Sequence, residues 1–316
     1  MKLATSTGDF TGYAETTADK VKAFKGSKFK YINLEQTRVT PEYLSHSDDD
    51  LKKLHEKLLK SAEFAGVEYV VSHAPCFHFA IPDALNNKDN EEYKNNVNAI
   101  RRSIIMCNML GIKRTVVHAC VHSDFSVKDF YKYNTMFYRD IFETAEKCGV
   151  TIMTENWDNN STHFSTGKEI RDFIEHMDHP LFAACWDTAH GNIDEKARNI
   201  GQYENILYLG DKLKGLHISD NFGDCHHHTW PFAGIIKFDS VMQALLDVNY
   251  DGYFTFEASY TLLHSANIPY HREPWEHNGK TVSKLLDPPI ELKIKAVDLL
   301  YDVGKYILDS YGCFEK

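Results

Sequence analysis

Four side chains that can bind a divalent cation each stand where a short apolar, strand-like run of the sequence ends. The runs read VTIMTEN, FAACWDT, LKGLHIS and YFTFEAS, and the four side chains are Glu155, Asp187, His217 and Glu257. Carboxylate and imidazole groups together suit a hard or borderline divalent cation. One candidate ligand therefore follows each of four successive predicted strands. This is the pattern expected of a barrel of parallel strands, in which the carboxyl ends of all strands lie at one rim.

Further side chains continue this pattern and are candidates for additional metal ligands. They are His73 in YVVSHAP, His118 in RTVVHAC, His190 in WDTAH, and Asp224 and His226 in DCHHH. A single His or Asp beside a strand is more often a hydrogen-bonded structural residue than a ligand. The joint placement of these residues at successive strand ends, or in the segments that follow, favours a metal centre.

The same residues predict a type of reaction. A divalent cation chelated by the carbonyl and the adjacent hydroxyl of a sugar stabilises the enediolate that forms when a carbon-bound proton leaves. Glu155 and Glu257 follow predicted strands that are not adjacent in a closed barrel, so we expect two proton-transfer groups on opposite sides of the metal. Reprotonation on the opposite face gives epimerisation, reprotonation of the neighbouring carbon gives isomerisation, and loss of a β-substituent gives lyase or dehydratase chemistry. Trp157 lies beyond its strand end, where an indole can stack on a sugar.

Eight strand-like segments alternate with helix-like segments along the chain. The strands are expected near residues 2–8, 30–36, 69–75, 114–120, 151–156, 182–188, 214–220 and 253–259. The helices are expected over residues 50–66, 91–111, 129–149, 167–177, 238–250 and 291–312. Gly66, Gly111 and Gly149 predict left-handed ends for three of these helices. Such an alternation with right-handed crossovers predicts an α/β fold, the (β/α)8 TIM barrel, because an open doubly wound sheet would not gather six consecutive strand ends around one centre.

Composition is consistent with an enzyme-sized α/β barrel. The chain has 316 residues, 43% of them hydrophobic, and we expect residues 1–316 to form one barrel domain. Two rim loops, near 76–90 and 260–289, are longer than a barrel needs and carry aromatic and His residues, so we expect them to cover substrate or contact another subunit of a homo-oligomer.

Charge and cysteine content exclude several other classes of protein. A net charge of −10 makes a nucleic-acid partner unlikely, because phosphate binding needs clustered Lys and Arg. The seven cysteines are scattered without a CxxC pair, which is typical of reduced thiols in a cytoplasmic protein. No apolar run approaches the length of about 20 residues that crosses a bilayer, so we expect no membrane association. Neither a GxGxxG nor a Walker-type motif supports nucleotide binding.

The motifs SHAP, TEN, WDTAH, LHISDN, DCH and GYFTFEAS resemble the successive motifs of the xylose-isomerase-like TIM-barrel superfamily. The resemblance is to its sugar phosphate isomerase/epimerase group, which is related to endonuclease IV. It implies that the four ligands named first correspond to the four-ligand site of ketose 3-epimerases, and that His190 contacts substrate. It also implies that four further residues correspond to the extra ligands of the trinuclear zinc site of endonuclease IV. These residues are His73, His118, Asp224 and His226.

Two enzymatic functions and one non-enzymatic function are compatible with these observations. The first is a metal-dependent isomerase or epimerase that acts on a small-molecule carbohydrate with Mn, Mg, Co or Zn. The second is a trinuclear zinc phosphodiesterase resembling endonuclease IV. The third is a binding protein that keeps the barrel without turnover, which the intact ligand set disfavours. Metal content separates the first two, since about one ion per chain favours the epimerase and about three favour the hydrolase.

Overall fold

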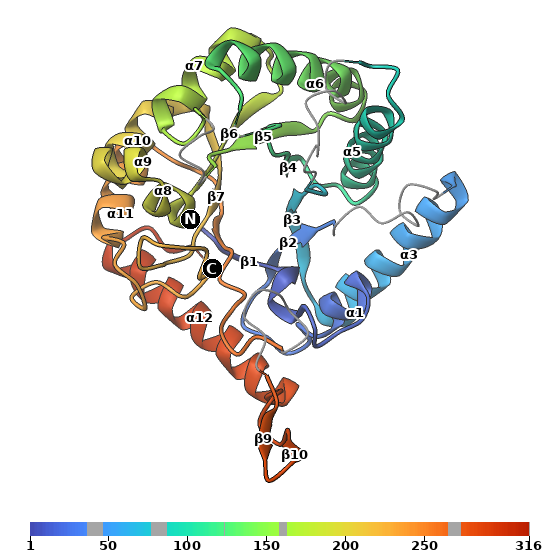
Figure 1. Ribbon diagram of the computed structural model, residues 1–316, viewed down its shortest axis with the longest axis vertical. Coiled ribbons are helices and arrows are strands. Elements are labelled where there is room, and N and C mark those ends of the chain that lie inside the picture. Colours follow the sequence, from blue (N-terminus) through green and yellow to red (C-terminus); the bar gives the residue numbers. More distant parts are fainter. Residues whose placement is uncertain (37–46, 77–86, 123, 158–162, 265–272, 316) are drawn as a thin grey trace.

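Eight parallel strands form a ring that is surrounded by helices in the computed structural model of the chain (Figure 1). The structure describes residues 1–36, 47–76, 87–122, 124–157, 163–264 and 273–315. The strands of the ring are β1 (Leu3–Ser6), β2 (Tyr31–Glu35), β3 (Glu68–His73), β4 (Arg114–Val116), β5 (Thr151–Glu155), β6 (Phe182–Asp187), β7 (Leu213–His217) and β8 (Phe254–Phe256).

The ring closes into a barrel through two kinds of contact. Consecutive strands from β1 to β7 pair in parallel, and β1 also pairs in parallel with β8. The remaining gap is bridged just beyond β7, where the amide of Ile218 donates to the carbonyl of Thr255 at 2.8 Å. The amide of Glu257 then donates to the carbonyl of Ile218 at 3.0 Å. The predicted (β/α)8 barrel is therefore confirmed, and all strands point the same way.

Helices cover the outside of the barrel and begin and end with specific caps. They are α1 (Thr17–Lys22), α3 (Asp48–Ala65), α5 (Glu91–Met109), α6 (Val127–Cys148), α7 (Gly167–Met177), α8 (Thr188–Ile193), α9 (Glu195–Ile200), α10 (Gln202–Leu209), α11 (Phe238–Asp247) and α12 (Ile290–Ser310), with short 3-10 turns η1 (Thr7–Phe10) and η2 (Gly210–Lys212). Capping boxes start α3, α6 and α7, where a Ser or Thr side chain and an acidic side chain three residues later bond each other's backbone amides. The left-handed ends predicted at Gly66, Gly111 and Gly149 are present, with φ of 71°, 76° and 61°.

Side-chain alternation along the strands decides which residues enter the barrel. Successive side chains of a strand point to opposite faces, so Met153 and Glu155 share one face of β5 while Ile152 and Thr154 take the other. The inward positions form a small apolar cluster, which consists of Val71, Val116, Met153, Ala183 and Cys185. The next inward residue after this cluster on β5 and β6 is a carboxylate at the strand's carboxyl end. The cluster therefore lies directly beneath the rim that carries these carboxylates.

Two parts of the chain contain structure that periodicity in the sequence did not indicate. Between β6 and β7 lie three short helices, α8 to α10, where we predicted none. Each has six to eight residues, too few to repeat an apolar stripe. Within the second long loop, β9 (Trp275–His277) and β10 (Lys280–Val282) form an exposed antiparallel hairpin that projects beyond the end of α12 (Figure 1). Most of the first predicted loop, residues 77–86, lies outside the described residues.

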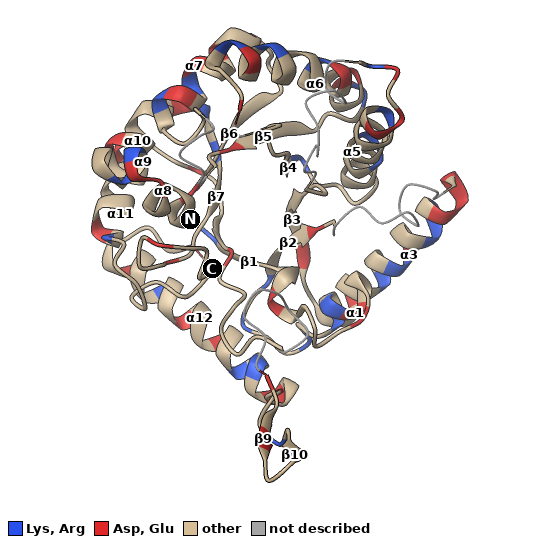
Figure 2. Ribbon diagram, viewed as in Figure 1, with Lys and Arg blue, Asp and Glu red and all other residues tan. Residues whose placement is uncertain are grey.

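Positive and negative side chains are mixed along the outer helices that the structure describes. Figure 2 shows Lys and Arg interspersed with Asp and Glu around the ring. Many form pairs one helical turn apart, such as Lys168 with Asp172 at 2.6 Å on α7. Surface pairs of this kind contribute little stability. Within the described part of the chain, no helix combines the length and the apolar character needed to cross a membrane.

Candidate metal centre

Four ligand-type side chains converge at the carboxyl ends of β5 to β8. Glu155, Asp187 and His217 are the last residues of their strands, and Glu257 directly follows β8. Because β5, β6 and β7 run in parallel register, Asp187 lies opposite His217 across the β6–β7 ladder. One ligand atom from each of the four residues lies within 4.8 Å of every other. The structure therefore brings together the four residues that the sequence predicts as ligands, while metal binding itself stays a prediction.

Within this group, two carboxylates contact the same histidine nitrogen. Nδ1 of His217 lies 2.9 Å from Oε1 of Glu155 and 3.0 Å from Oε2 of Glu257. Oδ2 of Asp187 is buried without a hydrogen-bond partner in the described structure. An unpaired buried carboxylate oxygen is costly unless a cation compensates its charge. Three carboxylates and one imidazole fit a divalent cation of the borderline or hard class. The carboxylate oxygen of Asp187 that has no hydrogen-bond partner is consistent with such an ion.

Two histidines extend the centre toward β3 and β4. Nε2 of His118 donates to Oε2 of Glu155 at 3.0 Å, and Nε2 of His73 lies 3.1 Å from the same His118 atom. Nδ1 of His73 donates to the carbonyl of Ala74 at 2.7 Å, which leaves Nε2 as the ring atom facing Glu155. Glu155 consequently lies between two groups, with one oxygen toward His217 and the other toward His73 and His118.

Burial and mutual attraction shift the pKa values of these groups in opposite directions. Burial acts to raise the pKa of Glu155, but attraction to His217 and hydrogen bonds from His118, His217 and His73 hold it well below its usual value. Burial raises the pKa of Asp187 despite the attraction of His190. The pKa of His118 falls to about 4 because burial outweighs its hydrogen bond to Glu155. Near neutral pH, Glu155 is therefore ionised and His118 is a neutral imidazole.

Neighbouring polar groups orient Asp187 and His190. Asp187 caps the N-terminus of α8, where its Oδ1 accepts from the amide of His190 at 2.8 Å. The Asn156 side chain donates to the Asp187 carbonyl at 2.9 Å and accepts from its amide at 2.7 Å. Nδ1 of His190 donates to the Asn156 carbonyl at 2.8 Å, and its Nε2 lies 4.0 Å from Oδ2 of Asp187. Sequence analysis missed Asn156, although it directly follows Glu155 in the motif TEN.

The other predicted residues are placed at different distances from this centre. Trp157 lies over the rim, with its ring 4.7 Å from that of His118 and 6.0 Å from that of His190. The ring of His226 lies 4.6 Å from that of His190. The structure does not bring Asp224 into the group, because its exposed carboxylate clusters with Cys225 and His227 instead.

A single carboxylate fixes the segment after β7 that carries these residues. Asp220 accepts hydrogen bonds from four backbone amides, at 2.9 to 3.1 Å, and the donors are Asn221, Phe232, Gly234 and Ile236. A Cβ atom on Gly234 would lie 2.3 Å from the Asp220 carboxylate, so this approach requires glycine. Sequence analysis missed this role, which the motif LHISDN contains but does not reveal.

The opposite side of the rim, at β1 and β2, also contains buried charges. Asp9 in η1 accepts from the Thr5 hydroxyl at 2.7 Å, and the Lys293 ammonium in α12 donates to the carbonyls of Ser259 and Thr261 at 2.8 and 2.7 Å. Burial raises the pKa of Asp9 to about 6 and lowers that of Lys293 to about 8. Since Ser259 and Thr261 closely follow Glu257, Lys293 supports the segment that carries this ligand.

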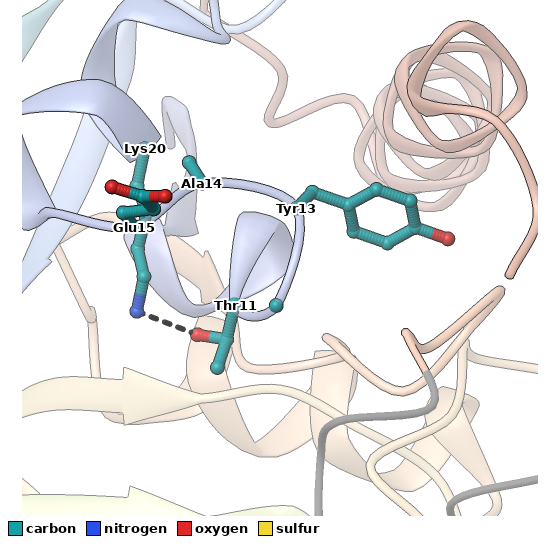
Figure 3. Close-up of a pocket in the computed structure, with 6 residues that line it drawn as sticks. Thr11, Tyr13, Ala14, Glu15 and Lys20 are labelled. Atoms are coloured by element: carbon teal, nitrogen blue, oxygen red, sulfur yellow. Dashed lines mark hydrogen bonds between the residues drawn. The ribbon is translucent and has the colours of Figure 1, made fainter.

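A cavity of about 460 Å³ opens beside the end of β1 (Figure 3). Its lining includes Thr11, Tyr13, Glu15 and Lys20. The buried Lys20 ammonium donates to the Thr11 hydroxyl at 2.8 Å, as the dashed line in Figure 3 marks, while Tyr13 points away from this pair. The Tyr13 hydroxyl instead donates to the Leu262 carbonyl at 2.5 Å. The cavity therefore presents hydroxyl and charged groups to a ligand.

Comparison with known proteins places these observations in a wider group. A family model described as a xylose isomerase-like TIM barrel matches residues 21–278. A ketose 3-epimerase of Arthrobacter globiformis is 25% identical over 119 residues, which are 37% of this chain and 38% of that protein. The aligned region thus spans less than half of either protein.

Two solved structures resemble the whole chain. A D-psicose 3-epimerase with D-tagatose from Clostridium cellulolyticum H10 has a TM-score of 0.67 at 17% identity, covering 98% of this chain and 99% of that one. A protein called IOLI, with a bound zinc atom, has the same TM-score and identity and covers 98% of this chain and 99% of its own. At such low identity, the similarity establishes the shared fold alone.

Proposed function

The chain belongs to the xylose isomerase-like TIM-barrel family, and from this premise we propose that it is a metal-dependent carbohydrate isomerase or epimerase. The observation that carries the proposal is the convergence of Glu155, Asp187, His217 and Glu257 within 4.8 Å at the barrel mouth. The ketose 3-epimerase relative and the structural similarity to a D-psicose 3-epimerase support this choice of reaction.

The four converging residues would hold the cation, which we propose to be Mn, Mg, Co or Zn. Zinc is represented among the structural neighbours. When bound, a divalent cation would polarise the substrate carbonyl and stabilise the negative charge that develops on its oxygen. The orphaned Asp187 oxygen and the depressed pKa of Glu155 are consistent with this site, because both favour a nearby positive charge.

Glu155 and Glu257 are the proposed proton-transfer groups. Both carboxylates reach the same His217 nitrogen, at 2.9 and 3.0 Å, yet they come from the ends of β5 and β8. A sugar carbon held between them would expose one face to each carboxylate. One carboxylate would remove the proton and the other would return a proton to the opposite face, which inverts that carbon. The Glu257 side chain keeps more solvent exposure than that of Glu155, 18% against 0%, and is better placed to exchange its proton with water.

We assign substrate contacts to Trp157 and His190. Trp157 lies over the rim beside His118 and can stack on the apolar face of a sugar ring or chain. His190 lies beside two of the four converging residues, 3.5 Å from Oε1 of Glu155 and 4.0 Å from Oδ2 of Asp187, and from there its imidazole would bond a substrate hydroxyl. The cavity beside β1 offers the Thr11 hydroxyl and the Lys20 ammonium, and we propose that these groups bond hydroxyls of the substrate.

A second function is favoured by one observation, the approach of His73 and His118 to the second oxygen of Glu155. These residues would hold an additional cation that shares Glu155, as a multinuclear zinc phosphodiesterase requires. The absence of a basic surface in the described structure disfavours a polynucleotide substrate. We therefore rank hydrolysis, and the lyase reaction that would start from the same enediolate, below epimerisation.

The decisive experiment is incubation of the purified protein with a panel of ketoses and Mn²⁺ in D2O. Epimerisation or isomerisation incorporates deuterium from the solvent at the carbon next to the carbonyl, which NMR detects. Metal analysis of the same sample should give about one ion at the barrel centre for the epimerase and about three there for the hydrolase. Cleavage of a phosphodiester without deuterium incorporation into any sugar would overturn the proposal.

A further inference from the structure

Outside the barrel, a second group of ligand-type side chains lies on the segment between β7 and α11. Asp224, Cys225 and His227 each offer one ligand atom within 4.8 Å of the other two. Nδ1 of His227 lies 3.6 Å from Sγ of Cys225 and 3.4 Å from Oδ1 of Asp224, so one ring nitrogen faces both other ligand atoms. Thiolate, imidazole and carboxylate are the three ligand types from which proteins build zinc sites.

We propose that Asp224, Cys225 and His227 form a second site, for a thiophilic divalent cation such as Zn²⁺, that is separate from the barrel centre. The ligands come from four consecutive positions, so a short backbone segment alone sets their geometry. Three protein ligands would leave one position of a tetrahedral zinc ion open to water or another ligand. This proposal is independent of the reaction assigned to the barrel and uses none of its four ligands.

The backbone that precedes the group is held in place before any cation arrives. Arg198 donates to the Gly223 carbonyl at 2.8 Å, and the Gly223 amide donates to the Asn221 side chain at 2.9 Å. The Cys225 amide donates to Oδ1 of Asp224 at 2.9 Å, which orients that carboxylate. A preorganised chelate loses less conformational entropy when it binds a metal.

The alternation of side chains along this segment links the outer group to the barrel mouth. Cys225 and His227 lie in the outer group, whereas His226 and His228 contact the mouth. The ring of His226 lies 4.6 Å from that of His190, and Nδ1 of His228 donates to the Glu257 carbonyl at 3.0 Å. A cation held by the outer residues would therefore restrain the backbone from which the inner histidines reach toward the reactive carboxylates.

Binding requires the Cys225 thiol to lose its proton to solvent as the metal–sulfur bond forms, so metal uptake should release protons. The thiolate also gives the site a spectroscopic signature. Co²⁺ replaces Zn²⁺ in such sites, and a cobalt–thiolate bond adds a charge-transfer absorption band in the near ultraviolet. Oxygen and nitrogen ligands alone do not produce this band, so it reports the thiol directly.

The test titrates metal-free protein with Co²⁺ and compares wild type, Cys225→Ser and Cys76→Ser. Cys76 is the matched control because its thiol lies within 4.8 Å of ligand atoms of His73 and His118, beside the barrel centre. We expect the thiolate band in wild type and in Cys76→Ser. In Cys225→Ser the band should be absent, and the protein should bind one equivalent of Co²⁺ less than wild type. A band that persists in Cys225→Ser, a band that disappears only in Cys76→Ser, or the absence of a band in wild type would overturn the proposal.

A second measurement does not depend on the folding of the serine variant. In wild type, saturating Zn²⁺ should slow alkylation of Cys225 by iodoacetamide, as read by peptide mass spectrometry. His227→Ala should weaken the zinc affinity that gives this protection at least about tenfold, since even partners outside the ligand shell contribute ten- to hundredfold to metal affinity. Equal protection in wild type and His227→Ala would contradict a shared site.

Discussion

The two sides of the barrel mouth both bury charged groups, but they pair them differently. On the β5–β8 side, three carboxylates surround one imidazole, and an oxygen of Asp187 is left without a hydrogen-bond partner in the described structure. On the β1–β2 side, the Asp9 carboxylate accepts a hydrogen bond from a hydroxyl. The Lys293 ammonium donates hydrogen bonds to two backbone carbonyls. Burial alone therefore does not identify the reactive side. The side that we propose to be reactive differs in that its ligand-type side chains converge and one of their oxygens has no hydrogen-bond partner in the described structure. On the other side, Asp9 and Lys293 form hydrogen bonds, and those of Lys293 support the surrounding backbone.

The largest effect expected from this difference is on turnover at the β5–β8 side. Glu257→Gln keeps the shape and one oxygen ligand but removes the basic carboxylate, so turnover should fall at least about a hundredfold, as for loss of a general base. Solvent deuterium incorporation and a circular dichroism spectrum measure activity and folding on the same sample. Glu63→Gln, on the exposed face of α3, is the control and should retain wild-type turnover. Undiminished turnover in Glu257→Gln would remove this residue from the reaction.

The next effect concerns metal affinity, and the chain offers a matched pair of aspartates. Asp187 and Asp194 both cap a helix through Oδ1 and both bury an Oδ2 without a hydrogen-bond partner. Asn caps helices about as well as Asp. Asp187→Asn should therefore weaken Mn²⁺ binding about ten- to hundredfold, while Asp194→Asn should leave it unchanged, as measured by titration calorimetry. Equal losses in both variants would mean that charge near the helices, not ligation, sets the affinity.

On the β1–β2 side, the expected effect is on stability and its pH dependence. Because burial raises the pKa of Asp9 to about 6, the folded protein holds this proton more tightly than the unfolded chain does. The resulting stabilisation is present at acidic pH and is lost as pH rises through about 6. Between about pH 5 and pH 7 the free energy of unfolding of wild type should fall about 1 kcal/mol more than that of Asp9→Asn. Urea unfolding at both pH values measures this, and parallel changes in the two proteins would contradict the assignment.

The smallest effect is expected in the cavity beside β1. Lys20→Met removes a buried ammonium that bonds Thr11 but keeps most of the side-chain volume. If the cavity binds the part of the sugar remote from the reacting carbon, KM should rise roughly threefold with little change in kcat. Lys22→Met, on the exposed part of α1, controls for the loss of charge. A fall in kcat without a rise in KM would place Lys20 among the groups that act on the reacting carbon instead.

Sequence periodicity was sufficient to predict the barrel and the positions of the four ligand-type side chains that converge in it. The strands with their terminal ligands repeat in a regular way, and a parallel barrel allows only one rim for those ends. Family membership and fold are confirmed, whereas the assignment of Glu155 and Glu257 as proton-transfer groups stays a prediction. The long helices were predicted because their glycine caps and acidic starts are local signals.

Features that depend on contacts between distant segments could not be predicted in the same way. The three short helices after β6 have too few turns to show a period, and the hairpin at β9 and β10 is exposed on both faces. Asp224 lies with Cys225 and His227, a grouping that its spacing from His217 does not indicate, because the local bonds of a loop decide where its side chain points. Lys293 lies on α12, far from Asp9 and Ser259 in sequence, so only the closed fold reveals their relationship.

Asp220 has a consequence for where this chain can accept substitutions. Its carboxylate binds main-chain amides of residues 221, 232, 234 and 236, and it makes these bonds without regard to the side chains between them. The residues from 222 to 231 can therefore be exchanged while the ends of the segment keep their anchor. Substitutions there would alter what the barrel mouth recognises without dismantling it, which makes this segment the natural target for altering ligand preference by mutagenesis.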